Sequence, residues 1–170
     1  LHNLLKNKQL IFEFHTTPKY TFKNFVVCDE NEMAYNISLQ ISQNPLKGIN
    51  PVYICGGSGT GKTHLLQAIG NSIKKSLPFL SLLYVSSSDI LKQYNNTLSY
   101  EEIITISKEY KNVDILLIDD IHLINNADSV QEQVFYIYNE LISKGKRVIV
   151  AGRMLPEYII GLNDYLKSRF

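Results

Sequence analysis

Apolar residues along this chain alternate between short, nearly continuous runs and longer stretches in which they recur every three or four positions. The short runs are rich in β-branched residues, as in strands buried on both faces, and cover residues 51–55, 80–85, 113–118 and 146–151. The longer stretches have helical spacing and cover residues 30–43, 64–74, 88–95, 99–110 and 130–144. This alternation predicts an α/β fold with a mainly parallel sheet.

Local signals refine the ends of these elements. Asn44-Pro45 stops the first helix, because proline disfavours a helical conformation in the residue before it. Ser129 and Glu132 have the capping-box spacing that opens a helix. Two helices follow the second strand, one more than a βαβ crossover requires. We therefore interpret the stretch of about 88–110 as a functional insertion.

The first part of the chain has a weaker pattern. Residues 1–14 mix lysines with apolar residues and would form a strand or a terminal extension, so we treat residues 1–17 as an extension and residues 18–170 as the core. Residues 18–27 are aromatic and extended, with too little periodicity for a helix. Such a segment either lines the base of a nucleotide or packs in the core, and the sequence leaves both interpretations open.

A glycine-rich loop joins the first predicted strand to its helix. Its sequence, Gly56-Gly57-Ser58-Gly59-Thr60-Gly61-Lys62-Thr63, fits the phosphate-binding pattern G-x-x-x-x-G-K-[ST]. Glycines let the backbone approach a polyphosphate, and successive N–H groups at the start of a helix attract anions. Lys62 would reach the β- and γ-phosphates, and the Thr63 hydroxyl would bind Mg²⁺. The predicted ATP-binding residues are Gly57, Ser58, Gly59, Thr60, Gly61, Lys62, Thr63 and His64, of which His64 is expected to pack or cap beside the loop.

Two carboxylates, Asp119 and Asp120, come directly after the third buried run. Ligands of parallel sheets gather at the carboxyl ends of the strands, so both acids should meet the phosphate loop. Asp119 suits the Mg²⁺ shell, usually through water, in the Walker-B role. Asp120 is placed to orient or deprotonate the attacking water. The alternative interpretation of such a pair is a helix cap or a solvated turn.

Composition narrows the class of protein. The 170 residues include 45% hydrophobic residues, enough for one well-formed core, and the net charge is +1. A strongly basic nucleic-acid-binding domain is excluded, so any DNA contact would need a local surface. Cys28 and Cys55 lack metal-ligand spacing and are expected as buried, reduced thiols, with a disulfide as the alternative. The absence of a signal peptide and of a membrane-length apolar run predicts a cytoplasmic protein.

Four collinear segments together resemble the AAA+ domain of the bacterial replication initiator family DnaA: residues 20–27, 56–65, 116–121 and 166–170. The resemblance covers roughly residues 18–170. It implies an α/β AAA+ P-loop NTPase core with a five-stranded, mainly parallel sheet between helices. It also implies slow ATP hydrolysis, ATP-dependent assembly into a filament on the replication origin, and opening of the duplex.

The resemblance further implies roles and partners. Lys62, the other phosphate-loop residues and the pair Asp119 and Asp120 match the family's nucleotide-binding and Walker-B positions. Arg169 matches the arginine that a neighbouring subunit directs at the γ-phosphate, so it would act in trans. The insertion helices would touch single-stranded DNA, and a replicative helicase or its loader would be a further partner. A lid subdomain and a helix-turn-helix that binds double-stranded origin DNA would follow after Phe170.

Several positions depart from the family pattern. Arg153 stands where the family usually has an aspartate sensor, and a cation cannot orient water as a carboxylate does, so hydrolysis would be weak or differently arranged. Tyr165 replaces a second arginine, and Cys28 replaces a glycine. The loop 125–128 lacks the basic residues common in the family, which weakens the case for a DNA contact there.

Three function classes are compatible with these motifs. The first is the ATPase core of a DnaA initiator. The second is a DnaA-like regulator or helicase loader that uses ATP as an assembly switch, and the residues at positions 153 and 165 favour it slightly. The third is a metabolic P-loop enzyme such as a small-molecule kinase, for which the sequence offers no acceptor-binding residues.

Overall fold

A four-stranded parallel sheet forms the centre of the molecule. The computed structural model describes residues 17–96 and 100–170, and therefore leaves most of the predicted extension 1–17 outside the described residues. The strands run in the order β1-β4-β3-β2, and every neighbouring pair is parallel. Their bounds are Val52–Cys55 for β1, Leu82–Ser86 for β2, Ile115–Asp119 for β3 and Arg147–Gly152 for β4. The four strands predicted from the apolar runs are thus confirmed.

The strand count differs from the five implied by the resemblance. Within residues 17–96 and 100–170 the sheet has four strands, and β1 lies at one edge. The aromatic segment before α1 forms the 3₁₀ turn η1 (Phe22–Asn24) instead of a strand. The segment after β4 forms η3 (Pro156–Tyr158) and turns. No described segment outside the four strands therefore pairs with the free edge of β1.

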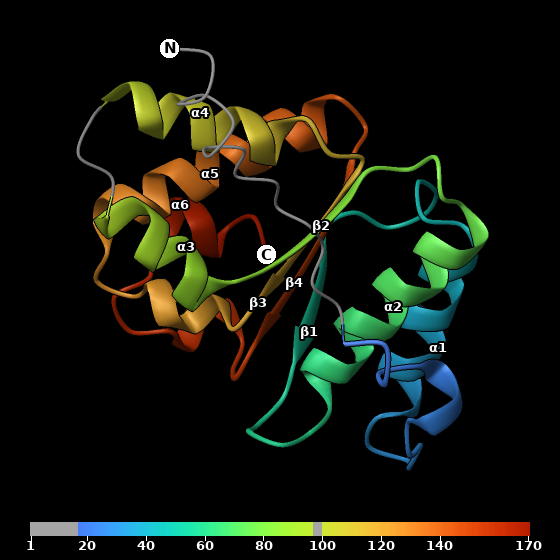
Figure 1. Cartoon of the computed structure of the whole chain (residues 1–170). Helices are drawn as coiled ribbons and strands as arrows, with labels where there is room; N and C mark the ends of the chain where they lie inside the picture. Colours follow the sequence, from blue (N-terminus) through green and yellow to red (C-terminus); the bar gives the residue numbers. More distant parts are fainter. Residues whose placement is uncertain (1–16, 97–99) are drawn as a thin grey trace.

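Helices cover both faces of the sheet (Figure 1). On one face lie α1 (Glu32–Gln43) and α2 (Lys62–Ser76). On the other lie α3 (Ser87–Asn95), α5 (Asp128–Ser143) and the short α6 (Asp164–Lys167), with α4 (Tyr100–Lys111) packed against α5. None of the helices in the described part of the chain has both the length and the apolar character needed to cross a bilayer.

Alternation along the strands divides the core into two clusters. In β3, Leu116 and Ile118 pack with α3 and α5, whereas Ile115 and Leu117 pack with α1 and α2. All five residues of this strand are buried. This explains why the sequence shows a continuous apolar run, because a strand covered on both faces has no solvent side.

One predicted helix start is wrong by two residues. The capping box at Ser129 predicted that residue as the N-cap, but α5 begins at Asp128 and Ala127 occupies the N-cap position without a side-chain cap. Asp128 in the first turn supplies a carboxylate that favours the positive end of the helix dipole. The loop before α5 is held instead by the backbone, because Asn126 N donates to Gly161 O at 2.9 Å.

Arg147 anchors the loop between α1 and β1. Arg147 is the first residue of the central strand β4 and is only 2% exposed. The guanidinium donates from Nε to Pro45 O at 2.6 Å, and also donates to the carbonyl oxygens of Lys47 and Ile49. Burial lowers the pKa of Arg147. Hydrogen bonds to a charged group contribute roughly 1.5–3 kcal/mol each, so this residue fixes how the chain enters β1 and, four residues later, the phosphate loop.

Candidate functional site

The phosphate loop lies between the end of β1 at Cys55 and the start of α2 at Lys62. Gly59 and Gly61 have φ values of 78° and 92°, a left-handed region that favours glycine. Lys62 is 8% exposed, and its Nζ donates to Gly57 O at 2.6 Å. The predicted lysine is therefore folded over the loop that it is expected to serve, and its amine lies at the loop backbone.

The loop also requires glycine for space. A Cβ added to Gly61 would lie 2.6 Å from Cε2 of Phe25, and one added to Gly56 would lie 2.7 Å from Oγ1 of Thr60. Real Cβ atoms do not approach other atoms so closely. Thr60 in turn donates its hydroxyl to Gly57 O at 3.0 Å, which closes the loop on itself. Glycine at these positions thus lets the Phe25 ring and the Thr60 side chain pack directly against the loop backbone.

Aromatic residues from the segment before α1 pack against the start of α2. His64 Nε2 lies 2.8 Å from Thr21 O, and its ring lies 5.0 Å from that of Tyr20 and 5.1 Å from that of Phe25. Phe25 also stacks on Tyr35 of α1 at 5.8 Å. His64 is therefore a packing residue beside the loop, in agreement with the expectation. It holds the aromatic segment in place.

A pocket of about 640 Å³ joins this segment to the phosphate loop. The segment contributes Phe25 and Val26 to its lining, and the loop contributes Gly59, Gly61 and Lys62. Phe25 packs against the core, which confirms the packing interpretation, and it also lines the pocket, so contact with the base of a nucleotide stays a prediction. An apolar wall beside an anion-binding loop is the arrangement that a nucleotide needs, with its base on the wall and its phosphates on the loop.

The acid strand meets the loop beside that pocket. Thr63 Oγ1 donates to Asp119 Oδ2 at 2.6 Å, and Asp119 is 2% exposed. Tyr84 of β2 donates its hydroxyl to the same carboxylate oxygen at 3.0 Å. Burial, together with the neighbouring Asp119 carboxylate, raises the pKa of Tyr84, so its hydroxyl stays protonated as a donor. The two predicted Mg²⁺ ligands are in direct contact.

Tyr84 is a site residue that the sequence analysis missed. It lies in a strand predicted from its apolar character, where a tyrosine is an ordinary core residue. Only the register, in which Tyr84 pairs with Leu117 and Ser86 pairs with Asp119, brings the hydroxyl to the acid. The register between two strands that are distant in the sequence cannot be read from the sequence of either strand. No local signal therefore marks the contact of Tyr84 with Asp119.

Asp120 turns out of the strand. Its φ is 53°, a left-handed conformation that aspartate tolerates better than most residues, and its N–H donates to Asp119 Oδ1 at 2.9 Å. The side chain is 40% exposed, unlike that of Asp119. The structure thus gives the two acids different surroundings, with Asp119 fixed by hydrogen bonds and Asp120 open to water.

His122 lies behind this acid, in the 3₁₀ turn η2 (Ile121–Ile124). Its side chain is 12% exposed, and Nδ1 lies 3.9 Å from Asp120 Oδ1. Burial lowers the pKa of His122, against the opposing influence of Asp120, so the neutral imidazole is favoured. Neither ring nitrogen has a hydrogen-bond partner within residues 17–96 and 100–170. The imidazole of His122 is therefore largely buried and is not part of a solvated turn.

The residues at the loop fit ATP and Mg²⁺. Mg²⁺ prefers oxygen ligands and is usually bound by one or two carboxylates, phosphate oxygens and several waters. Thr63 and Asp119 offer a hydroxyl and a carboxylate 2.6 Å apart, and Thr63 directly follows the lysine of the phosphate loop. The described residues contain no group of three or more His, Cys, Asp and Glu side chains able to hold a metal by themselves. A metal ion here would therefore rely on the phosphates of a nucleotide for further ligands.

Arg169 and Arg153 lie apart from the phosphate loop's lining. The Arg169 guanidinium lies 5.7 Å from the ring of Phe135 on α5, and its carbonyl oxygen accepts a hydrogen bond from Tyr138 at 3.3 Å. Arg169 is exposed and does not line the 640 Å³ pocket. Arg153 follows β4, is also exposed, and contributes to the lowered pKa of His122.

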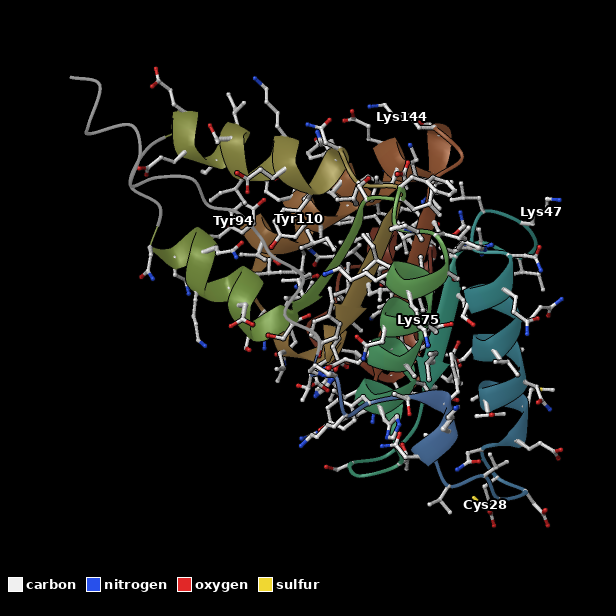
Figure 2. The ribbon with its side chains drawn as sticks, turned by 45° about the vertical axis from the view of Figure 1, so that its right-hand side comes forward. Cys28, Lys47, Lys75, Tyr94, Tyr110 and Lys144 are labelled. Carbon is white, nitrogen blue, oxygen red and sulfur yellow. The ribbon has the colours of Figure 1, made fainter. Side chains whose placement is uncertain are left out.

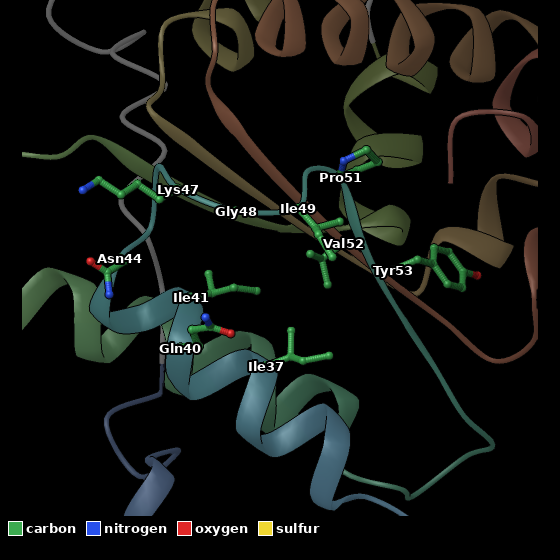
Figure 3. Close-up of a pocket in the computed structure, with 10 residues that line it drawn as sticks. All are labelled: Ile37, Gln40, Ile41, Asn44, Lys47, Gly48, Ile49, Pro51, Val52 and Tyr53. Carbon is green, nitrogen blue, oxygen red and sulfur yellow. The ribbon is translucent and has the colours of Figure 1, made fainter.

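A second pocket of about 560 Å³ lies between α1 and the outer edge of β1, as Figure 3 shows. Ile37, Gln40 and Ile41 project from α1 toward Val52. Among the residues that line this pocket, Lys47 alone carries a charge. The pocket therefore lacks the paired acids and the anion-binding backbone found at the phosphate loop.

The cysteines contradict the expectation of buried thiols. Cys28 and Cys55 are both free and both exposed. Cys28 lies in the turn before α1, and Cys55 ends β1 just before the phosphate loop. Apolar neighbours in the sequence do not bury a side chain when the backbone turns at that position, which is why the composition of the surrounding segment was misleading.

Comparison with known proteins agrees with this geometry. The family model described as the bacterial DnaA ATPase domain matches residues 16–170. The chromosomal replication initiator protein DnaA of Thermodesulfovibrio yellowstonii is 38% identical over 165 residues, which is 97% of this chain and 38% of that protein. The chain thus spans well under half the length of this relative.

Solved structures show the same likeness. Domain III of the Thermotoga maritima replication initiation protein DnaA superposes with a TM-score of 0.86 at 37% identity, covering 91% of this chain and 64% of that one. A replication initiator DnaA bound to AMPPCP and single-stranded DNA gives the same TM-score at 36% identity, with coverage of 92% and 48%. The α/β fold expected from the sequence is confirmed by these structures.

Proposed function

Because this chain belongs to the bacterial DnaA ATPase domain family, we propose that it binds ATP with Mg²⁺ and forms the nucleotide-dependent core of a replication initiator. The observation that carries the proposal is the contact of Thr63 with Asp119, which brings the phosphate loop and the acid strand within 2.6 Å. The solved relative that holds AMPPCP, an ATP analogue, supports it.

Each residue at the loop has a role in this proposal. Backbone N–H groups of the loop bind the phosphates, and Lys62 exchanges its present acceptor, Gly57 O, for phosphate oxygens. Thr63 and Asp119 hold the Mg²⁺, whose charge would neutralise negative charge on the β- and γ-phosphates. Asp120, which is open to water, orients the attacking water or accepts its proton.

Substitution of Asp119 tests the metal part of the proposal. Asp119→Asn is expected to weaken Mg²⁺-dependent ATP binding by about 10- to 100-fold, since residues that support a metal contribute that much to its affinity. The measurement is a calorimetric ATP titration with Mg²⁺ and again with a chelator. With the chelator present, parent and variant should bind alike. Equal affinities in Mg²⁺ as well would remove Asp119 from the site.

The wider activity is proposed for the full-length protein. Residues 18–170 would form the AAA+ core, and α3 with α4 would form the insertion that shapes a filament on origin DNA. Lys92 and Lys108 lie exposed on these helices, where a DNA backbone could reach them. The relative bound to single-stranded DNA supports a DNA-binding role. The same proposal includes two further partners of the full-length protein, which are double-stranded origin DNA and a replicative helicase or its loader. It also places the protein in the cytoplasm.

Arg169 is proposed to act on the nucleotide of a neighbouring subunit. Its exposure, and the position of its guanidinium over Phe135 of α5, make it available to another copy. Gln131, fully buried in α5, positions the segment that leads to it: Nε2 donates to Ile124 O at 3.0 Å and to Gly161 O at 2.8 Å. Its Oε1 accepts a hydrogen bond from Asn163 N at 2.7 Å. The turn after the acid strand and the arginine segment are thus mechanically connected.

Arg169→Ala should leave ATP binding by the monomer unchanged and reduce ATP-dependent assembly of the full-length protein to the level seen without nucleotide. The reason is that the variant loses the cation that senses the neighbour's γ-phosphate. Light scattering against protein concentration measures assembly. Lys167→Ala, which removes a charge two residues away, serves as the control and should assemble normally. Normal assembly of Arg169→Ala would contradict the role in trans.

The regulator or loader alternative shares the ATP site but differs in what the switch controls. Arg153 at the end of β4 favours it to a limited degree, because a protein that needs no turnover can dispense with an acidic sensor. Origin-dependent assembly of the full-length protein would identify an initiator. Nucleotide-dependent binding to a helicase without any binding to origin DNA would identify the alternative.

A further inference from the structure

Both cysteines of the chain line the pocket at the phosphate loop. Cys28 and Cys55 come from segments 27 positions apart in sequence, yet both belong to the lining of the same 640 Å³ space as Gly59, Gly61 and Lys62. Both thiols are free and exposed. Figure 2 shows Cys28 at the rim of the molecule, on the segment that precedes α1.

The backbone holds each cysteine in place. Cys28 N donates to Asn31 Oδ1 at 2.9 Å, and Cys28 O accepts hydrogen bonds from the N–H groups of Asn31 at 3.0 Å and Glu32 at 2.9 Å. Cys55 pairs with Gly152 in the register of β1 and β4. The main chain of both cysteines is therefore held in place at the pocket wall.

We propose that Cys28 and Cys55 form a thiol modification site at which disulfide exchange and nucleotide binding exclude each other. The co-reactant is a low-molecular-weight disulfide such as glutathione disulfide. The inference rests on the proposed nucleotide site, because the excluded ligand is the nucleotide that would fill this pocket.

The exchange balances without any further reagent. A cysteine loses its proton to solvent, and the thiolate sulfur attacks one sulfur of the disulfide. A mixed disulfide between the cysteine and one half of the reagent forms as the original S–S bond breaks. The other half of the reagent leaves as a thiolate that takes up a proton. The cysteine is oxidised, and the departing half of the reagent is reduced.

Exclusion follows from shared space. A glutathionyl group attached at Cys55 would be bound one residue before Gly56, and one attached at Cys28 would be bound two residues after Val26. Both Gly56 and Val26 line the pocket. Either adduct extends from a wall of the space that contains the backbone N–H groups of the loop. A bound nucleotide conversely covers the thiols and blocks the approach of the disulfide.

The test uses the protein as parent, as Cys28→Ser, as Cys55→Ser and as the double serine variant. ATP affinity is measured on reduced protein, then after treatment with glutathione disulfide, and again after dithiothreitol, with mass spectrometry locating each adduct. We expect at least a tenfold loss of affinity on modification, full recovery on reduction, and no change on treatment in the double variant. At ATP concentrations 100 times the Kd, modification of the parent should slow by about 100-fold, since only the nucleotide-free fraction reacts.

The outcomes separate this inference from the function on which it rests. Reduced protein that fails to bind ATP would overturn both. Reduced protein that binds ATP, and binds it equally well with both thiols fully modified, would overturn the inference alone. So would thiols that resist the disulfide in the absence of nucleotide. If modification lowers the ATP affinity of only one of the two single-serine variants, the modification site is the cysteine that this variant retains.

Discussion

Replacing Lys62 with alanine is expected to weaken ATP binding by about 30-fold or more. The ammonium group is buried against the phosphate loop, 2.6 Å from Gly57 O, so its removal leaves the phosphates without their nearest cation. Loss of one partner from a desolvated charged pair costs roughly 2–5 kcal/mol, and 1.4 kcal/mol corresponds to a factor of ten. Calorimetric titration with ATP and Mg²⁺ measures the change.

The matched control for this substitution is Lys75→Ala. Lys75 lies near the other end of the same helix and is exposed, as Figure 2 shows. Both variants remove one positive charge from α2, so a general electrostatic effect would weaken binding in both. We expect Lys75→Ala to bind as the parent does. An unchanged Kd for Lys62→Ala would refute the assignment of the phosphate loop.

Asp120→Asn is expected to lower ATP turnover by about 10²- to 10⁴-fold, the range typical of a positioned general base. Binding should change little, because the side chain is 40% exposed and Asp119, not Asp120, contacts Thr63. The measurement is single-turnover hydrolysis at saturating ATP, combined with a Kd for the same variant. The asparagine keeps the size of the side chain and removes its negative charge and its basicity.

Asp164→Asn provides the control for that measurement, because its side chain is fully exposed on α6. It should hydrolyse ATP as the parent does. Equal turnover by Asp120→Asn and the parent would show that another group activates the water. Neutral His122, 3.9 Å from the acid, would then be the first residue to examine.

The sequence was sufficient for the elements and for the main contact of the site. Strand β3 was predictable because a strand buried on both faces is apolar throughout, and it places Asp119 at a carboxyl end whatever the details of packing. The phosphate loop at the start of α2 was predictable because its glycines have conformations that other residues rarely adopt. Together these two local signals predicted that Asp119 and Thr63 would meet.

The remaining features depend on tertiary arrangement. Tyr84 reaches Asp119 through strand register, and His122 is buried by packing around η2, neither of which leaves a local pattern. Exposure of Cys28 and Cys55 depends on which way a turn and a strand end face. The guanidinium of Arg147 donates to main-chain carbonyl groups about 100 positions earlier in the chain. Because every residue has such a carbonyl, the sequence does not show which ones accept.

The position of β1 at the margin of the sheet has a practical consequence for handling this protein. An edge strand presents unpaired main-chain N–H and C=O groups, with which a strand of another molecule can pair and start aggregation. Its four residues and the proline that precedes them limit such stacking, since a short strand offers few rungs and proline offers no N–H. Concentrated samples are therefore best screened for β-rich precipitates, and polar substitutions along that margin are a rational first remedy.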